Sequence, residues 1–267
     1  LPLWNSYSFF VTYANVDGWD PEKNMATTFT NPLDIWLNSF TEELVSKIDA
    51  SLGSYDFGKA IKDLYQYVDQ LTNWYIRRSR RRFWKSEDDN DKKEAYSCLY
   101  NALIKFCVVV APIAPFLADY IYKNLKTSKM AESVHLCDYP VENKKIRNYE
   151  LEKEMELVQK TVEMGRMLRA KVSINTRKPL NAVYLITKNE EEQRLLKKME
   201  SIIKEELNVK NVIYEKEEEK LVSLNCKANF KTLGKKLGKD MKEVAEIISK
   251  FSPKNANDIE NGVEISV

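Results

Sequence analysis

A pattern of apolar residues at helical spacing runs from Phe57 to Ile76 and leads directly into the most basic stretch of the chain. The apolar positions recur every three or four residues, which predicts one long helix with a single buried face. That face comprises Phe57, Ile61, Leu64, Tyr65, Val68, Leu71, Tyr75 and Ile76. We expect the helix to continue to Lys85 and the rest of the chain to be organised around it.

The end of this helix, from Asn73 to Lys85, holds five arginines within positions 77–82 and a tryptophan on either side of them. Residues three and four apart on a helix lie one above the other. One face therefore carries a tryptophan and four basic residues, which are Trp74, Arg77, Arg78, Arg81 and Lys85. Guanidinium groups pair with phosphates, and indole and guanidinium planes stack on bases, so this face predicts nucleic-acid binding.

Three alternatives stand beside that interpretation. Charge runs on helices are commonly solvated faces, and some of these arginines can pair with acids such as Asp69. A tryptophan in a helical bundle is more often buried than free to meet a base, which applies to Trp74.

The overall composition limits the possible partners. Of the 267 residues, 31% are charged and 43% are hydrophobic, and the formal net charge is +2, so a polyanion must be met by a local basic patch. No apolar run is long enough to span a bilayer, and the first residues lack a signal-peptide pattern. We therefore expect a cytoplasmic protein without a membrane partner, and one that is part of a longer chain.

Cysteine and histidine usage argues against metal and catalytic sites. Cys98, Cys107, Cys137 and Cys226 lack the paired spacing of a zinc site, and His135 is the single histidine. We expect reduced structural thiols, no metal ligands, no catalytic residues and a structural role for His135.

Residues 1–148 show further helical patterns. One runs from Leu3 to Ala14, and another from Leu33 to Leu52 begins after Asn31-Pro32. A third runs from Ala95 to Val110 and resumes at Phe116 after two prolines. Residues 15–30 are expected to form a loop, and residues 133–140 an extended segment over the bundle. The predicted fold of this part is a bundle of four or five helices.

The character of the chain changes after a connecting helix and linker at residues 149–178. Residues 182–187 and 209–215 are predicted strands, with a helix around Leu195 to Ile203 between them. Alternation from Val222 to Phe230 predicts a third strand, followed by a helix from Leu237 to Ile248 and a strand at 263–267. The order β-α-β-β-α-β predicts a small α+β domain at residues 179–267. The predicted fold class is therefore mainly α with this addition.

Several motifs together resemble the part of isoleucyl-tRNA synthetases that lies after the catalytic domain. They occur in order along the chain: Leu3-Trp-Asn5, Asn31-Pro-Leu-Asp34, Leu71-Thr-Asn-Trp-Tyr-Ile-Arg-Arg78 through Phe83-Trp84, Ala111-Pro-Ile-Ala-Pro-Phe116, Ser133-Val-His-Leu-Cys-Asp138, Gly165-Arg-Met-Leu-Arg169 and Arg177-Lys-Pro-Leu180. The resemblance covers nearly the whole chain and is most specific up to about residue 180. The motifs at Ser133–Asp138 and Gly165–Arg169 favour the isoleucine enzymes over their valyl and leucyl relatives.

The resemblance implies a helical anticodon-binding domain followed by a tRNA-contacting C-terminal region, with isoleucine-specific tRNA and the catalytic domain of the same chain as partners. Members of the family join isoleucine to tRNA using ATP and magnesium, and this region itself would need no cofactor. The chain lacks the family's His-x-Gly-His and Lys-Met-Ser-Lys-Ser motifs, so we expect this region alone to be inactive. It also lacks the cysteine-ligated zinc module of many bacterial members.

The candidate tRNA-binding residues come from three stretches of the chain. They are Trp4, Asn5, Asn73, Trp74, Arg77, Arg78, Arg81, Lys85, Arg166, Arg169 and Arg177. Lys231, Lys235, Lys236, Lys239 and Lys242 form a lysine-rich surface with a weaker claim. The alternative function is a helical scaffold that positions the catalytic domain or a protein partner and has little RNA affinity of its own.

Overall fold

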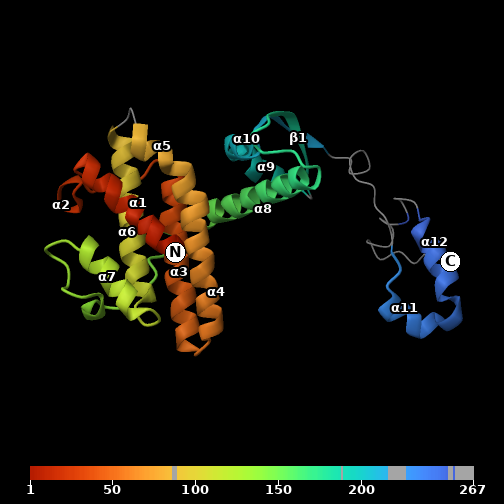
Figure 1. The fold of residues 1–267 in the computed structure, drawn as a ribbon, viewed down its shortest axis with the longest axis horizontal. Coiled ribbons are helices and arrows are strands. Elements are labelled where there is room, and N and C mark those ends of the chain that lie inside the picture. Colours follow the sequence, from red (N-terminus) through yellow and green to blue (C-terminus); the bar gives the residue numbers. More distant parts are fainter. Residues whose placement is uncertain (86–88, 188, 216–226, 252–254, 256–267) are drawn as a thin grey trace. The chain divides into compact units, whose positions relative to one another are not determined.

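The computed structural model describes residues 1–85, 89–187, 189–215, 227–251 and 255 (Figure 1). The chain divides into two compact units, Leu1–Leu157 and Val158–Val267. The three-part division at residues 148 and 178 stays a prediction.

The first unit is a bundle of helices. Its longer members are α1 (Pro2–Asp17), α3 (Pro32–Gly53), α4 (Phe57–Asp69), α5 (Arg77–Lys85), α6 (Asp89–Val110) and α7 (Pro115–Leu125). Their ends follow local chemistry, because the Asn31 side chain caps α3 through Leu33 N and the Asp56 side chain caps α4 through Lys59 N. Proline opens α1, α3 and α7, where its missing N–H costs little.

Aromatic side chains join α3, α4 and α6 into one core. Trp36, Phe40, Tyr67 and Phe106 form a stacked column with successive ring centroids 5.3, 5.4 and 5.4 Å apart. Tyr67 and Phe106 are almost completely buried. Since α3 and α4 are linked by a short turn, they lie side by side, as Figure 1 shows.

The predicted long helix is continuous, but its middle is a π-helix, η1 (Gln70–Ile76), between α4 and α5. A π turn takes in more residues than an α turn, so it changes which side chains face the core. The prediction of a uniform buried face was therefore wrong in part. Phe57, Ile61 and Tyr65 are exposed, whereas Trp74, which was expected on the basic face, is buried.

Two segments of the first unit differ from their predictions. Residues 15–30 are not a simple loop, because α1 continues to Asp17 and the short helix α2 covers Pro21–Asn24. The segment 133–140 is not fully extended either, since Val134–Leu136 form the 3-10 turn η2. Val134 is buried there, and its N–H donates to the Asp119 carboxylate at 3.1 Å.

The second unit contains a β-α-β element. Strands β1 (Leu180–Ile186) and β2 (Val209–Glu215) are parallel, with Leu180 opposite Val209 and Ile186 opposite Glu215. Parallel strands need a long crossover, here formed by α9 (Glu190–Lys198) and α10 (Glu200–Leu207). The single helix predicted between the strands is thus two helices.

Helix α8 (Tyr149–Lys171) precedes the strands, and the boundary between the two units falls within it. Further along, α11 (Phe230–Leu237), the 3-10 turn η4 (Gly238–Asp240) and α12 (Met241–Ser249) follow. Phe230 was predicted to end a strand but begins α11, because the Asn229 side chain caps that helix. The rest of the predicted third strand, up to Cys226, and the strand at 263–267 lie outside the described residues. The predicted fold class, mainly α with a small α+β part, is confirmed.

Candidate nucleic-acid interface

Helix α5 presents a group of side chains to solvent that we call its outer face: Arg77, Arg80, Arg81 and Trp84. Spacings of three and four place them on one side of the helix. The three arginines are exposed, and Trp84 is 49% exposed. The Cζ atom of Arg80 lies 5.8 Å from the Trp84 ring centroid, within the range of a cation–π pair. The outer face therefore offers guanidinium groups for phosphates and a broad planar surface for a base.

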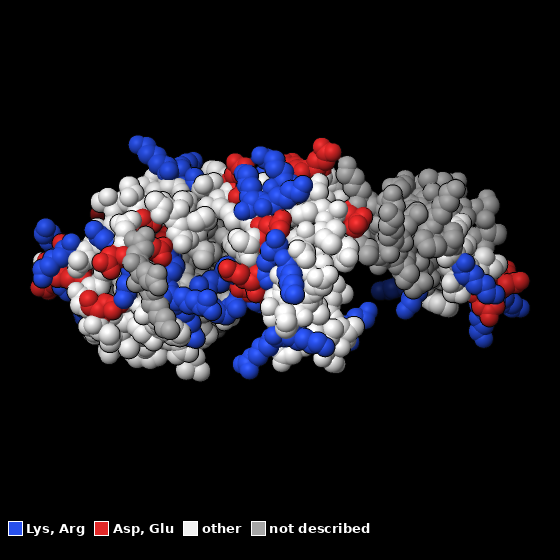
Figure 2. Space-filling view, turned by 90° about the horizontal axis from the view of Figure 1, so that it is seen from above, with Lys and Arg blue, Asp and Glu red and all other residues white. Residues whose placement is uncertain are grey.

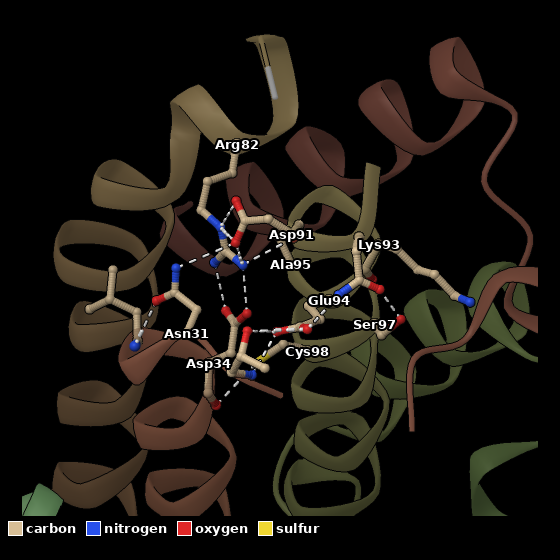
Figure 3. Close-up of polar contacts among 12 residues, drawn as sticks. Asn31, Asp34, Arg82, Asp91, Lys93, Glu94, Ala95, Ser97 and Cys98 are labelled. Carbon is tan, nitrogen blue, oxygen red and sulfur yellow. Dashed lines mark hydrogen bonds and ion pairs between the residues drawn. The ribbon is translucent and has the colours of Figure 1, made fainter. Parts of the chain in front are cut away.

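The opposite side of α5 carries Arg82, which is enclosed by acids (Figure 3). Its Nη1 and Nη2 donate to the two Asp34 oxygens at 2.8 and 2.6 Å, as a paired fork. Its Nε donates to both Asp91 oxygens at 2.9 Å, and its Nη2 also reaches the Asp91 carbonyl at 3.0 Å. Every nitrogen of this guanidinium is engaged within the fold, so Arg82 holds α5 against α3 and α6.

Burial and charge act together on this network. The Asp34 side chain is fully buried, and the Tyr75 hydroxyl donates to its Oδ1 at 2.6 Å. Burial by itself lowers the pKa of Arg82, but the hydrogen bonds to Asp34 and Asp91 outweigh it and raise that pKa above its ordinary value. Burial, and then the Asp34 charge, raise the pKa of Tyr75 well above its ordinary value. The folded state thus stabilises a charged arginine and a protonated tyrosine here.

Further contacts near Arg82 join α6 to α3 and to the segment before it. Glu94, on α6, accepts a hydrogen bond from the Thr30 N–H at 2.7 Å, just before α3 begins. The Cys98 thiol donates to the Asp34 carbonyl at 3.4 Å, and burial raises its pKa well above the ordinary value. Cys98 is therefore an inert core thiol, as expected.

Trp74 and Arg78, predicted on the basic face, lie further in. Trp74 is 6% exposed, and its Nε1 donates to Met155 Sδ at 3.1 Å. Arg78 is half-buried, with its Cζ 5.6 Å from the Trp74 ring centroid. These two residues therefore do not belong to the outer face. Because the Trp74 ring is buried, a base cannot stack on it.

The remaining first-unit candidates are spread over the bundle. Asn73 is exposed, and its Nδ2 donates to Asp69 Oδ1 at 2.7 Å. Trp4 and Asn5 are exposed on α1, where the Trp4 ring lies 5.8 Å from that of Tyr120 on α7. Lys85 ends α5, and its side chain lies outside the described part of the structure.

In the second unit, Arg166 and Arg169 serve the fold. Arg166 pairs with Glu206 on α10. Arg169 is 5% exposed, and its guanidinium donates to four backbone carbonyls, which are those of Asn175, Lys178, Leu207 and Asn208, at 2.6 to 3.2 Å. Arg177 is exposed on the loop that Arg169 secures.

Two residues of the outer face were missing from the candidate set. Arg80 and Trp84 fall outside the predicted face, because that face is in phase with Trp74. Their spacing of four, an arginine followed one turn later by a tryptophan, was the available signal. Seen from above, from the end where α5 lies in Figure 1, the surface carries clusters of basic side chains interspersed with acidic ones (Figure 2). The positive charge of this surface is therefore confined to local clusters.

The described residues include no group of three or more His, Cys, Asp or Glu that could hold a metal ion. Among them, Cys98, Cys107 and Cys137 are unbridged, while Cys226 lies outside the description. None of the helices in these described ranges has the length and apolar character needed to cross a membrane.

Comparison with known proteins identifies the family to which this chain belongs. The family described as "Anticodon-binding domain of tRNA ligase" matches residues 34–185, more than half of the chain. The chain belongs to this family of anticodon-binding domains.

The full-length relatives narrow the comparison further. The chain is 49% identical to the isoleucine–tRNA ligase of Treponema denticola, with 100% of the chain aligned to 25% of that protein. It is 43% identical to the isoleucine–tRNA ligase of Treponema pallidum strain Nichols, with 99% of the chain aligned to 25% of the relative. The isoleucine–tRNA ligase of Protochlamydia amoebophila is 39% identical, over 100% of the chain and 26% of the relative. The chain thus spans about a quarter of the length of the curated relatives it matches, and the resemblance inferred from its motifs is confirmed.

Proposed function

We propose that this chain binds tRNA through the outer face of α5, as the anticodon-recognition part of an isoleucine–tRNA ligase. The observation that carries the proposal is the division of the arginines on one helix. Arg82 is engaged on all sides by acids and fixes the helix, while Arg77, Arg80 and Arg81 face solvent beside Trp84. Three exposed arginines beside an exposed indole on one side of a helix supply the groups that bind phosphates and bases.

The relatives support a proposal for the activity of the parent protein. We propose that the full-length protein joins isoleucine to its tRNA in the cytoplasm, using ATP and magnesium. The described residues hold no group of three or more His, Cys, Asp or Glu side chains that could bind a metal ion by themselves. That chemistry belongs to parts of the relatives outside the matched quarter, and this chain would contribute tRNA recognition.

A salt titration tests the proposal. Binding of isoleucine tRNA to the chain should weaken linearly on a log–log plot, with a slope of about 0.7 to 0.9 per phosphate contact. Three arginines then predict a slope of about two or more. A tRNA with a different anticodon should bind more weakly at every salt concentration. Affinity that does not change with salt would contradict phosphate binding by the outer face.

A specific observation also favours the scaffold function for another face. Trp4 is 41% exposed, and near it on α7 Phe116, Leu117 and Tyr120 are 91%, 41% and 53% exposed. Exposed apolar groups of this kind commonly mark protein contacts. In the intact ligase, Phe116→Glu should lower aminoacylation without changing the tRNA affinity of this region. Unchanged aminoacylation would remove the support for a docking role.

A further inference from the structure

The outer side of α4 carries an exposed row of apolar and aromatic residues, which the described part of the first unit does not cover. Phe57, Ile61 and Tyr65 lie four residues apart and are 52%, 43% and 75% exposed. Tyr55, just before the helix, is 82% exposed and has a positive φ of 58°. For a non-glycine residue this backbone conformation is uncommon. Exposed aromatic rings in such a row need an explanation beyond the packing of the bundle.

This row continues into the arginines of α5. Stepping by four from Tyr65 gives Asp69, Asn73, Arg77 and Arg81, and all four are exposed. In a regular α-helix a step of four drifts steadily around the axis, because the turn holds about 3.6 residues. The wider turns of η1, between Gln70 and Ile76, oppose that drift. The π segment therefore keeps the aromatic row and the outer face on one side of a continuous rod.

Contacts along the rod show that the middle of this stripe is fixed in place. Asn73 Nδ2 donates to Asp69 Oδ1 at 2.7 Å, and Arg77 Nε donates to the Asn73 carbonyl at 2.9 Å. The Asp69 carboxylate is thereby engaged, and that of Asp56 accepts from Lys59 N at 2.9 Å. These acids serve the helix itself, Asp56 as its N-cap and Asp69 as the partner of the Asn73 amide.

We propose that unpaired bases of the bound RNA stack on Tyr65 and Phe57, while Lys59 and Lys62 meet the adjoining phosphates. This inference rests on the proposed function of the outer face. Both lysines are exposed: Lys62 lies one turn before Tyr65 and Lys59 one turn before Lys62, so they follow the apolar row along its side. Aromatic platforms interleaved with basic side chains are the arrangement by which proteins bind single-stranded nucleic acid. Twelve residues separate Tyr65 from Arg77, about 18 Å along the rod at the rise of an α-helix, so one RNA segment can reach both.

RNA fits this surface better than a protein does. A protein-docking face is typically depleted of lysine at its centre. Here Lys62 lies one turn before Tyr65, beside the row, and the row leads toward arginines at its end. The stripe thus leads from base-stacking rings, past Asp69 and Asn73, to a phosphate-binding end.

The test compares variants of the whole chain for tRNA affinity and for salt dependence. Replacing both Tyr65 and Phe57 with Ala should weaken tRNA binding at least tenfold and leave the salt slope unchanged, because stacking releases no counterions. The matched control Tyr65→Phe keeps a ring and should stay within about twofold of wild type. Lys59→Ala with Lys62→Ala should lower the slope by about 0.7 per lost phosphate contact. Because these side chains are exposed, the tryptophan fluorescence of the folded chain should stay as in wild type.

A second RNA separates stacking from indirect effects. A fully paired RNA duplex has no bases to stack, so its affinity should be equal for wild type and the Tyr65/Phe57 variant. Unchanged tRNA affinity in that variant, with tRNA binding still lost in outer-face arginine variants, would overturn the inference and leave the proposed function standing. A fall in salt slope equal to that of the arginine variants would also overturn it, since α4 would then act only by arranging α5. Wild-type protein that shows no salt-dependent tRNA binding would overturn both proposals.

Discussion

The arginine helix of the first unit and the segment 165–178 of the second unit are both rich in basic residues. They differ in the groups that hold their buried arginine. In the first, Arg82 is held by carboxylates and one carbonyl. In the second, Arg169 is held by backbone carbonyls, two of them at the C-terminal end of α10. Carboxylates neutralise a buried guanidinium, whereas carbonyls at a helix end supply only partial negative charge.

Arg82 and Arg169 also stabilise different parts of the fold. Arg82 locks three helices and leaves Arg77, Arg80 and Arg81 facing solvent in a fixed order. Arg169 secures a loop and leaves Arg177 on it. In each run, therefore, some basic residues stabilise the fold and others face solvent. The number of charges in the run does not show which residues have which role.

The largest expected effect is on the carboxylate-held brace. Arg82→Ala leaves Asp34 buried without its partner and should destabilise the first unit by about 3 to 5 kcal/mol. Arg82→Lys should restore little, because an ammonium cannot form the fork to Asp34. All five tryptophans, at positions 4, 19, 36, 74 and 84, lie in the first unit, so the unfolding of that unit is measured by fluorescence in urea.

Arg80→Ala is the matched control for that measurement. It removes a charge from the exposed side of the same helix and should change the unfolding free energy by about 0.5 kcal/mol or less. Equal destabilisation by the two variants would show that the inner and outer sides do not differ as described.

The carbonyl-held brace comes next. Arg169→Ala removes the donor from four backbone carbonyls, of which that of Leu207 is in a buried contact, and should cost about 1 to 3 kcal/mol in the second unit. Hydrogen exchange should therefore speed up around β1 and α10, while the tryptophan-detected transition stays where it is. Loss of first-unit stability in this variant would mean that the two units do not unfold separately.

A pH titration probes the network around Arg82 with a somewhat smaller effect. The pKa of Tyr75 is raised above its ordinary value of 10.0, so the folded state keeps a proton that the unfolded state releases. Stability is then full below about pH 10 and falls as the pH rises further, by up to about 1.4 kcal/mol per pH unit from this group. Tyr75→Phe should reduce the steepness of this alkaline loss in fluorescence-detected urea unfolding between pH 9 and 11. The same steepness in both proteins would contradict a role for Tyr75.

The smallest effect is expected at the exposed end of the second basic segment. Arg177 and Lys178 are exposed, so changing both to Ala should alter the stability of the second unit by about 0.5 kcal/mol or less. Hydrogen exchange around β1 should match wild type. A change as large as that of Arg169→Ala would place these side chains in the support rather than on the surface.

The sequence supplied much of the fold because helical periodicity, caps and prolines act locally. Asn31-Pro32 and Pro115 mark helix starts that the structure confirms. The two strands 182–187 and 209–215 were also found within about two residues of β1 and β2. The family could be named from motifs spread along the chain.

The site was less predictable, since it depends on contacts between distant residues. The π-helix at Gln70–Ile76 shifted the phase of the rod, so Trp74 turned inward. Tyr65 lies before it in α4, outside the buried stripe of Ala60, Leu64 and Tyr67. Nothing in the run of arginines distinguishes Arg82, because its acids lie 48 and 9 residues away in the chain. Arg169 was likewise predicted to bind tRNA, because the carbonyls that it contacts lie 6 to 39 residues away in the chain.

The central claim is that the outer arginines bind RNA and do not support the fold. It is tested most directly by changing Arg77, Arg80 and Arg81 to Ala together, then measuring salt-dependent tRNA affinity and urea unfolding on the same sample. We expect affinity to fall tenfold or more, about 1.4 kcal/mol or above, and the salt slope to drop by about two units, with the unfolding free energy nearly unchanged. A protein that unfolds more easily but keeps the wild-type salt slope would show that these arginines are supports, and would contradict the account.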